Sequence, residues 1–156
     1  MRLLIVFIVG LMPAFFVILY ANRKAKKRKL QQNALLEKNP ELLGCGELYR
    51  VRYCSEARFK KIFKFSPWEA TGILCIQADR IIFLGNVLSG REIKLEFEKS
   101  SAAAEWVGKN NWFKNGLTAW LVINASGAKH YFTSETGVTV FGSGGTTKEM
   151  YEKLTR

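Results

Sequence analysis

The sequence predicts a transmembrane α-helix at the N-terminus, followed by a small antiparallel β domain of the α+β class that ends in one helix. Three observations lead to this fold class: 18 consecutive uncharged residues from Leu3 to Tyr20, apolar residues at alternate positions over much of residues 47–133, and a short amphipathic segment at the C-terminus. A chain of 156 residues is long enough for one domain and little more. Its hydrophobic fraction of 48% excludes a disordered chain.

The uncharged N-terminal run is the evidence for a membrane helix. As a helix it would be roughly 27 Å long, against a hydrocarbon core of about 30 Å. A cleaved signal peptide is the alternative, but only Arg2 precedes the run, and Ala-Asn-Arg-Lys follows it in place of a small-residue cleavage site. We therefore expect an uncleaved transmembrane anchor over residues 1–21.

A cluster of six cations follows the apolar run directly, and we call it the basic strip: Arg23, Lys24, Lys26, Lys27, Arg28 and Lys29. Because basic flanks remain on the cytoplasmic side, we expect an external N-terminus and a cytoplasmic C-terminal domain at the plasma or inner membrane. Unpaired Cys45, Cys54 and Cys75 would suit such a reducing compartment. The basic strip either attracts anionic lipid, at about 1 kcal/mol per charge, or serves only as the topology signal.

The net charge of +11 is concentrated near this strip. Residues 1–39 contain 8 basic and 1 acidic residue, whereas residues 40–156 contain 16 basic and 12 acidic residues. Binding to nucleic acid is therefore not expected of the domain. Residues 22–39 are rich in helix formers and predict a basic juxtamembrane helical stalk that ends before Pro40.

From residue 41 onward the apolar pattern changes to a period of two. In residues 47–53, Tyr49, Val51 and Tyr53 alternate with Arg50 and Arg52, which predicts a strand with its arginines exposed. Further strands are expected at residues 72–77, 80–84, 91–98, 117–124, 128–133 and 138–141, while residues 102–108 either extend the preceding strand or are irregular.

Two short segments complete the predicted domain. Ser126-Gly127 between two strands indicates a hairpin turn. At the C-terminus, Met150 and Leu154 form an apolar stripe on a helix predicted over residues 146–154. Together these elements predict a curved antiparallel β-barrel or sandwich of six to seven strands with a C-terminal helix.

The predicted central hairpin carries a resemblance to a known family. Its pattern, Gly72-x-Leu74-x-Ile76-x-x-x-Arg80-Ile81-Ile82-Phe83, resembles the central hairpin of GRAM domains in the pleckstrin-homology-like (PH-like) superfamily. Gln77 departs from the Ser or Thr usual in that family. The later strands and the terminal helix follow in the family's order. The resemblance implies that residues 40–156 form a PH-like, GRAM-type module that binds lipids or protein segments without catalysis.

Cations interleaved with aromatic residues precede this hairpin. A segment of this kind can insert rings among lipid headgroups while its cations meet phosphate, and PH-like domains often place basic ligand contacts here. The alternative is an edge strand with Phe59, Phe63 and Phe65 inside and lysines outside. The candidate lipid- or partner-binding residues of this segment are Arg58, Lys60, Lys61 and Lys64.

Trp112 and Phe113 are two further candidate binding residues, because they lie in a polar turn. Exposed aromatic residues there could enter a membrane or hold a partner peptide, and the alternative is that they fold back onto the core.

Nothing in the sequence indicates catalysis. The chain has a single His, and it contains no hydrolase or metalloprotease motif and no cluster of metal ligands. We expect no enzyme activity, metal or cofactor. The predicted function is that of a single-pass, membrane-anchored binding or scaffold module that contacts anionic lipid headgroups. The alternative is a protein-interaction module whose anchor only supplies its location.

Overall fold

The computed structural model describes residues 2–44, 46–62, 66–87, 89–109, 118–135 and 144–156, with side chains from Phe15 onward except at positions 17, 144 and 145. The elements run in the order α1 (Arg2–Lys38), η1 (Pro40–Leu42), β1 (Glu47–Ser55), α2 (Glu56–Lys60), β2 (Ala70–Ile76), β3 (Arg80–Val87), β4 (Glu92–Glu98), β5 (Ala103–Lys109), β6 (Ala119–Ala125), β7 (Ala128–Ser134) and α4 (Gly144–Thr155).

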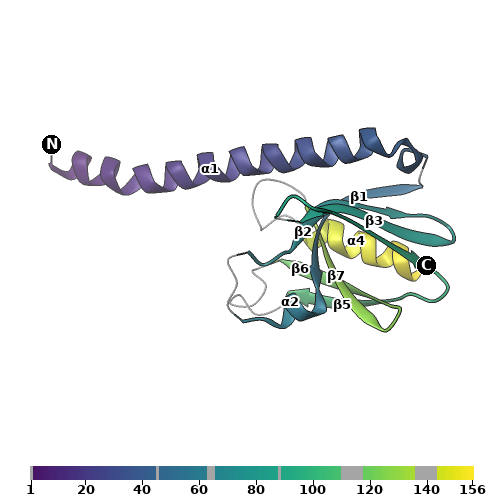
Figure 1. Cartoon of the computed structure of the whole chain (residues 1–156). Coiled ribbons are helices and arrows are strands. Elements are labelled where there is room, and N and C mark those ends of the chain that lie inside the picture. The colour runs from purple at the N-terminus through teal and green to yellow at the C-terminus, as the bar shows by residue number, and fades with distance from the viewer. Residues whose placement is uncertain (1, 45, 63–65, 88, 110–117, 136–143) are drawn as a thin grey trace.

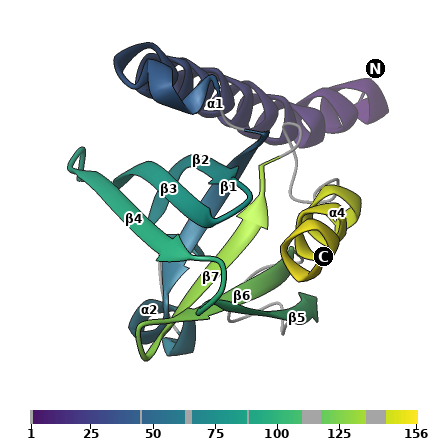
Figure 2. The same ribbon diagram turned by 90° about the vertical axis from the view of Figure 1, so that its right-hand side faces the viewer.

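The strands form one curved antiparallel sheet with the order β4-β3-β2-β1-β7-β6-β5 (Figure 1). Strand β1 joins the two halves of this sheet. Residues 47–53 of β1 pair with β2, and residues 51–55 pair with β7. The sheet therefore bends around β1 into a half-barrel with an inner and an outer face (Figure 2).

The main core lies on the inner face of the sheet. Phe83, Leu121 and Phe132 are completely buried there. Helix α4 covers this face with Met150 and Leu154, which are 0% and 8% exposed. Because the two residues are four apart, they lie on one side of the helix. The apolar stripe expected from the sequence is therefore what attaches α4 to the sheet.

Two glycines allow strands β2 and β3 to approach closely. Gly72 and Gly85 lie opposite one another in the register. A Cβ atom at Gly72 would lie 2.0 Å from the carbonyl oxygen of Leu84, far inside any allowed contact. Glycine is thus required at position 72 for steric reasons, and this position opens the hairpin pattern identified in the sequence.

The prediction of a transmembrane helix is wrong. Across the described part of the chain, no helix is long and apolar enough to cross a membrane. The uncharged run on which the prediction depended belongs to the 37-residue helix α1, which also carries the basic strip from Arg23 onward. The predicted anchor (1–21) and the predicted stalk (22–39) therefore share one helix over residues 2–38, which ends two residues before Pro40.

Two other expectations about secondary structure are changed by the structure. Residues 56–60 form the short helix α2, so the edge strand considered for this segment is wrong there. Residues 103–109 form a separate strand, β5, which pairs with β6. The strand expected at residues 138–141 lies outside the described residues.

Candidate functional site: the basic face of helix α1

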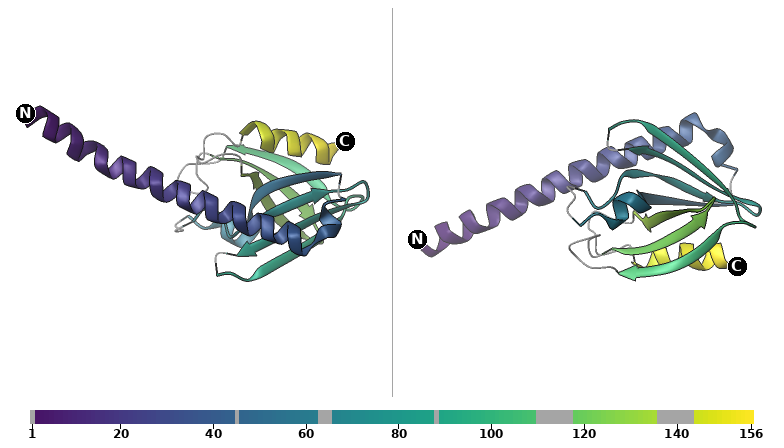
Figure 3. Two further views of the ribbon diagram at one scale, coloured as in Figure 1. Left: turned by 90° about the horizontal axis from the view of Figure 1, so that it is seen from above. Right: turned by 60° about the horizontal axis from the view of Figure 1, so that its bottom comes forward.

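Helix α1 lies across the outer face of the sheet with its C-terminal half, while its N-terminal half extends beyond the sheet (Figure 3). Gln32 and Leu35 on the docked side are each 2% exposed. Leu36 packs against a buried cluster made by Leu42, Cys75, Ile82 and Leu84. The side chains that face the sheet therefore recur every third or fourth residue, as on one side of a helix.

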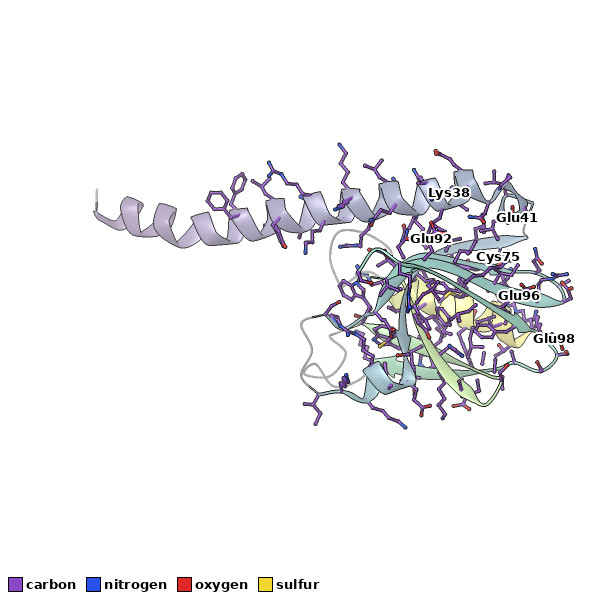
Figure 4. The ribbon with its side chains drawn as sticks, in the orientation of Figure 1. Lys38, Glu41, Cys75, Glu92, Glu96 and Glu98 are labelled. Carbon is purple, nitrogen blue, oxygen red and sulfur yellow. The ribbon has the colours of Figure 1, made fainter. Side chains whose placement is uncertain are left out.

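An exposed ion pair marks the end of this docked region. Lys38 Nζ lies 3.2 Å from Glu92 Oε1 at the start of β4 (Figure 4). Because both side chains are more than half exposed, this pair adds little to stability.

The centre of the docked region is Glu135, the residue that follows β7. Its carboxylate forms ion pairs with Arg28 of α1 and Arg52 of β1. Its second oxygen accepts a hydrogen bond of 2.9 Å from the Gln32 amide. Only 8% of the Glu135 side chain is exposed. One buried carboxylate thus joins α1 to the sheet and balances part of the positive charge of two guanidinium groups.

Trp68 completes this cluster. The guanidinium carbon of Arg52 lies 4.2 Å from the centroid of the Trp68 ring, and that of Arg28 lies 5.9 Å away. Burial lowers the pKa of the Arg52 guanidinium, and Glu135 beside it raises this pKa in part. Arginine stays protonated despite such a shift. The cluster of Arg28, Arg52 and Glu135 therefore retains an excess of one positive charge next to the underside of α1.

Two grooves flank the docked helix. The first, of about 400 Å³, we call the Arg50 groove, and it is lined by Asn22, Ala25, Lys26, Lys29, Gln32, Arg50 and Glu135. The second, of about 540 Å³, we call the Trp68 groove, and it is lined by Lys24, Lys27, Arg28, Gln31, Ser66, Pro67, Trp68, Thr71, Asn86, Val87 and Gly90. The two sets share no residue, because they belong to opposite flanks of α1.

The structure therefore divides the basic strip predicted from the sequence. Lys24, Lys27 and Arg28 line the Trp68 groove, and Lys26 and Lys29 line the Arg50 groove. Apart from Arg28, these cations are exposed, as is Arg23. Arg28 is half-buried and paired with Glu135, so it is the one member of the strip that has a structural role in docking α1.

The second candidate segment lies away from the basic strip. Figures 1 and 2 both show α1 along one side of the domain and α2 on the opposite side. Lys60 is exposed and lies 2.7 Å from Glu56, an ion pair that raises the pKa of Lys60. Arg58 is half-buried and donates a hydrogen bond to the Ser66 carbonyl, while Lys61 is exposed. One flat surface therefore cannot contact both basic segments.

The aromatic residue of α2 belongs to the structure of the domain. Phe59 is 7% exposed, and its ring stacks on that of Tyr131 with centroids 3.7 Å apart.

Three of the predicted binding residues, Lys64, Trp112 and Phe113, lie outside the described residues.

The N-terminal half of α1 exposes apolar side chains next to the basic strip. Phe15, Phe16, Ile18 and Tyr20 are each between 56% and 60% exposed. Lys24 lies over the Tyr20 ring, 4.9 Å from its centroid. Large apolar groups that are this exposed and contiguous mark an interaction surface.

The cysteines differ from the expectation that all three are unpaired. Cys54 is buried and is not part of a disulfide, whereas Cys75 is disulfide-bonded. Disulfides are typical of oxidising compartments, so this bond does not favour the reducing compartment predicted from the sequence. A cytoplasmic location at the plasma or inner membrane stays a prediction.

The described residues contain no group of three or more His, Cys, Asp or Glu side chains that could hold a metal ion. What the face of α1 offers chemically is positive charge, hydrogen-bond donors and exposed apolar area. Such an arrangement can bind an anionic surface or an anionic ligand.

Sequence reasoning missed the cluster under α1. Arg52 was expected on the exposed side of its strand, but it is 4% exposed because Trp68 and α1 cover it. Glu135 is 107 residues from its partner Arg28. In the sequence, Glu135 is only a single carboxylate two residues beyond the strand predicted at 128–133, and this signal is too weak to identify a partner.

No family model, curated protein or solved structure matches this chain. The resemblance to GRAM domains therefore stays a prediction.

Proposed function

We propose that the chain is a binding module that contacts an anionic membrane surface, and that residues 15–29 of α1, which we call the contact segment, make this contact. The proposal needs contact with a bilayer surface and no passage through it. The observation that carries it is the continuity of the exposed apolar side chains with the exposed cations along one helix. A helix of this composition places rings at the acyl boundary and cations among the headgroups.

The charge on the contact segment supports an anionic partner. It contains six basic residues and no acidic residue, and the first carboxylate along the chain is that of Glu37. Five of these cations are exposed. At about 1 kcal/mol for each cation near an anionic bilayer, they supply about 5 kcal/mol of attraction, which salt weakens. The exposed rings add an apolar contribution that salt does not screen.

Vesicle flotation with the full chain tests this proposal. Vesicles of phosphatidylcholine alone are compared with vesicles that also contain phosphatidylglycerol. We expect binding that requires the anionic lipid and falls as salt rises. The variant Lys26→Gln/Lys29→Gln should weaken it by about 30-fold, since two charges account for about 2 kcal/mol.

A matched pair of substitutions supplies the control. Lys60→Gln/Lys61→Gln removes the same charge from the opposite side of the domain, and it should leave flotation within about twofold of the parent, since a screened charge that far from the surface contributes little. Equal loss in both variants would show attraction by overall charge. A larger loss in the Lys60/Lys61 variant would identify α2 as the contact.

A second candidate function is recognition of a protein segment, and one observation favours it. Strand β5 is at the edge of the sheet, and its Trp106 is 41% exposed beside Tyr151. Edge strands can accept an added strand from a partner. A photo-crosslinker at position 106 tests this candidate: one recurrent protein adduct, lost when an excess of unlabelled chain is added, would support it, and lipid adducts alone would exclude it.

A further inference from the structure

We propose that the Trp68 groove is a specific site for an organic phosphate, that is, a phosphomonoester group attached to a small carbon body. This inference goes beyond the contact proposed above, because a dissolved phosphate ester would fill the groove as well as a lipid headgroup would. Three features carry it: the cations on one wall, the polar floor on the sheet, and the size of the groove.

The wall formed by α1 is entirely basic and polar. Lys24, Lys27 and Arg28 lie at positions i, i+3 and i+4, and so project from the same side of the helix. Among the described residues, none that lines the groove is acidic. Arg28 donates a hydrogen bond from Nε to the Glu135 carboxylate, and the two terminal nitrogens of this guanidinium have no hydrogen-bond partner within the described residues. They are the donors that match phosphate oxygens in pairs.

The floor of the groove is made by two polar residues on neighbouring strands. Thr71 of β2 and Asn86 of β3 lie directly opposite one another in the register, which places their Cβ atoms about 5 Å apart. Thr71 is only 5% exposed, and its hydroxyl has no hydrogen-bond partner in the described part of the chain. This hydroxyl borders the basic groove and is placed to donate a hydrogen bond to a ligand oxygen.

The size and the remaining wall indicate more than a bare anion. A volume of about 540 Å³ is within the roughly 300–1,000 Å³ typical of small-molecule sites. Pro67, Trp68 and Val87 add apolar surface beside the polar floor. The phosphate would lie between the α1 cations and Thr71, and its carbon body would lie against these three residues.

Phosphate is favoured over a carboxylate by the number and arrangement of the donors. The lining offers two ammonium groups, a guanidinium, two hydroxyls and two side-chain amides. These donors converge from two elements, so a tetrahedral group with three free oxygens can accept hydrogen bonds from the helix and the sheet together. A planar carboxylate has two oxygens and would leave one wall without a partner.

Calorimetric titration of the full chain with glycerol 3-phosphate at low ionic strength tests the inference. We expect saturable binding that Lys27→Gln weakens by about tenfold or more, because hydrogen bonds to charged groups are strong. Thr71→Val keeps the shape of the side chain and should weaken binding about fivefold through loss of the hydroxyl. The matched control is Lys26→Gln, one residue along α1 but in the Arg50 groove, which should change binding less than about twofold.

Vesicles with phosphatidic acid distinguish the two sources of the phosphate. Preference for phosphatidic acid over phosphatidylglycerol at equal surface charge, lost in Thr71→Val, would identify a lipid headgroup as a ligand. Without that preference, binding of glycerol 3-phosphate alone would identify a dissolved compound. The inference is overturned if glycerol 3-phosphate does not bind, or if Lys26→Gln and Lys27→Gln weaken it equally.

These outcomes are separable from those of the membrane proposal. Phe15→Ser/Phe16→Ser should reduce flotation and leave titration with glycerol 3-phosphate unchanged. If vesicles bind and glycerol 3-phosphate does not, the membrane contact stands and the groove inference fails. If glycerol 3-phosphate binds and anionic vesicles do not, the reverse holds.

Discussion

Glu135 forms an ion pair with Arg28 across 107 residues of sequence, and this contact joins the residue that follows β7 to the C-terminal half of helix α1. It has two consequences. It fixes the helix on the outer face of the sheet, and it determines the rotation of the basic strip, since Arg28 must face inward. Both grooves are lined by residues of α1 together with residues outside it, so we expect them to depend on the docking of α1.

Removal of the Glu135 carboxylate should therefore destabilise the domain. We expect Glu135→Gln to lower the free energy of unfolding by about 3 kcal/mol, because Arg28 and Arg52 would then be left largely buried without a counter-charge. Urea denaturation measures this change. The control is Glu92→Gln, which breaks the exposed pair with Lys38 and should cost less than about 1 kcal/mol. Equal costs in the two variants would contradict a central role for Glu135.

The same variant tests whether the grooves depend on helix docking. Local electrostatics alone predicts that loss of a carboxylate near basic side chains strengthens anion binding. If docking of α1 forms the site, Glu135→Gln should instead weaken binding of glycerol 3-phosphate and speed amide hydrogen exchange in residues 28–38. The two measurements must change together. Tighter binding with unchanged exchange would show that α1 docks independently of Glu135.

Gly72 should be the least replaceable glycine among those that the structure describes between strands. In Gly72→Ala the added methyl group would meet the Leu84 carbonyl at 2.0 Å, so β2 and β3 must separate. We expect a loss of at least about 3 kcal/mol, at the severe end for single substitutions, or failure to fold. Gly46→Ala is the matched control, because its Cβ would meet the nearest atom at an ordinary 3.6 Å. Thermal unfolding followed by circular dichroism compares the two.

The single histidine should make stability depend on pH. Burial lowers the pKa of His130 below its ordinary value of 6.5; the ring is half-buried, and its Nδ1 lies 3.1 Å from the Tyr53 hydroxyl. The unfolded chain therefore binds a proton at a higher pH than the folded chain does. Stability is fully present above pH 6.5 and falls as pH drops through this value toward the lowered pKa. Urea titrations at pH 7.5 and 5.5 should show this fall.

His130→Gln supplies the control for the pH dependence. Because the chain has no other histidine, this variant should lose most of the dependence between pH 7.5 and 5.5. An unchanged dependence in the variant would assign it to carboxylates and contradict a role for His130.

The strands could be predicted from the sequence because their faces differ. Ile93, Leu95 and Phe97 alternate with charged residues, and they lie on β4 facing the core. The hairpin turn at Ser126-Gly127 could also be predicted from the sequence. Both residues have positive φ, 52° and 74°, which is the backbone that two-residue hairpin turns require. In these segments the local pattern and the final contacts point to the same structure.

The position of α1 could not be predicted, because it depends on contacts between distant residues. Its apolar run predicted a membrane span from length alone, and nothing local indicates that Gln32 and Leu35 pack on the sheet. The strand considered for the α2 segment was wrong for a related reason. Cations and aromatic residues that alternate over a few positions fit a strand and a helix almost equally well, and the stacking of Phe59 on Tyr131 decides between them.

The most direct test of the central claim is flotation of the full chain with vesicles that contain phosphatidylglycerol, measured as salt is raised. If the contact segment binds the membrane, we expect binding at low salt that decreases as salt rises. Lys26→Gln/Lys29→Gln should weaken this binding about 30-fold. Lys60→Gln/Lys61→Gln should bind the vesicles as the unsubstituted chain does. Binding that is insensitive to salt, or equally weakened by both double substitutions, would contradict the assignment of membrane contact to the basic face of α1.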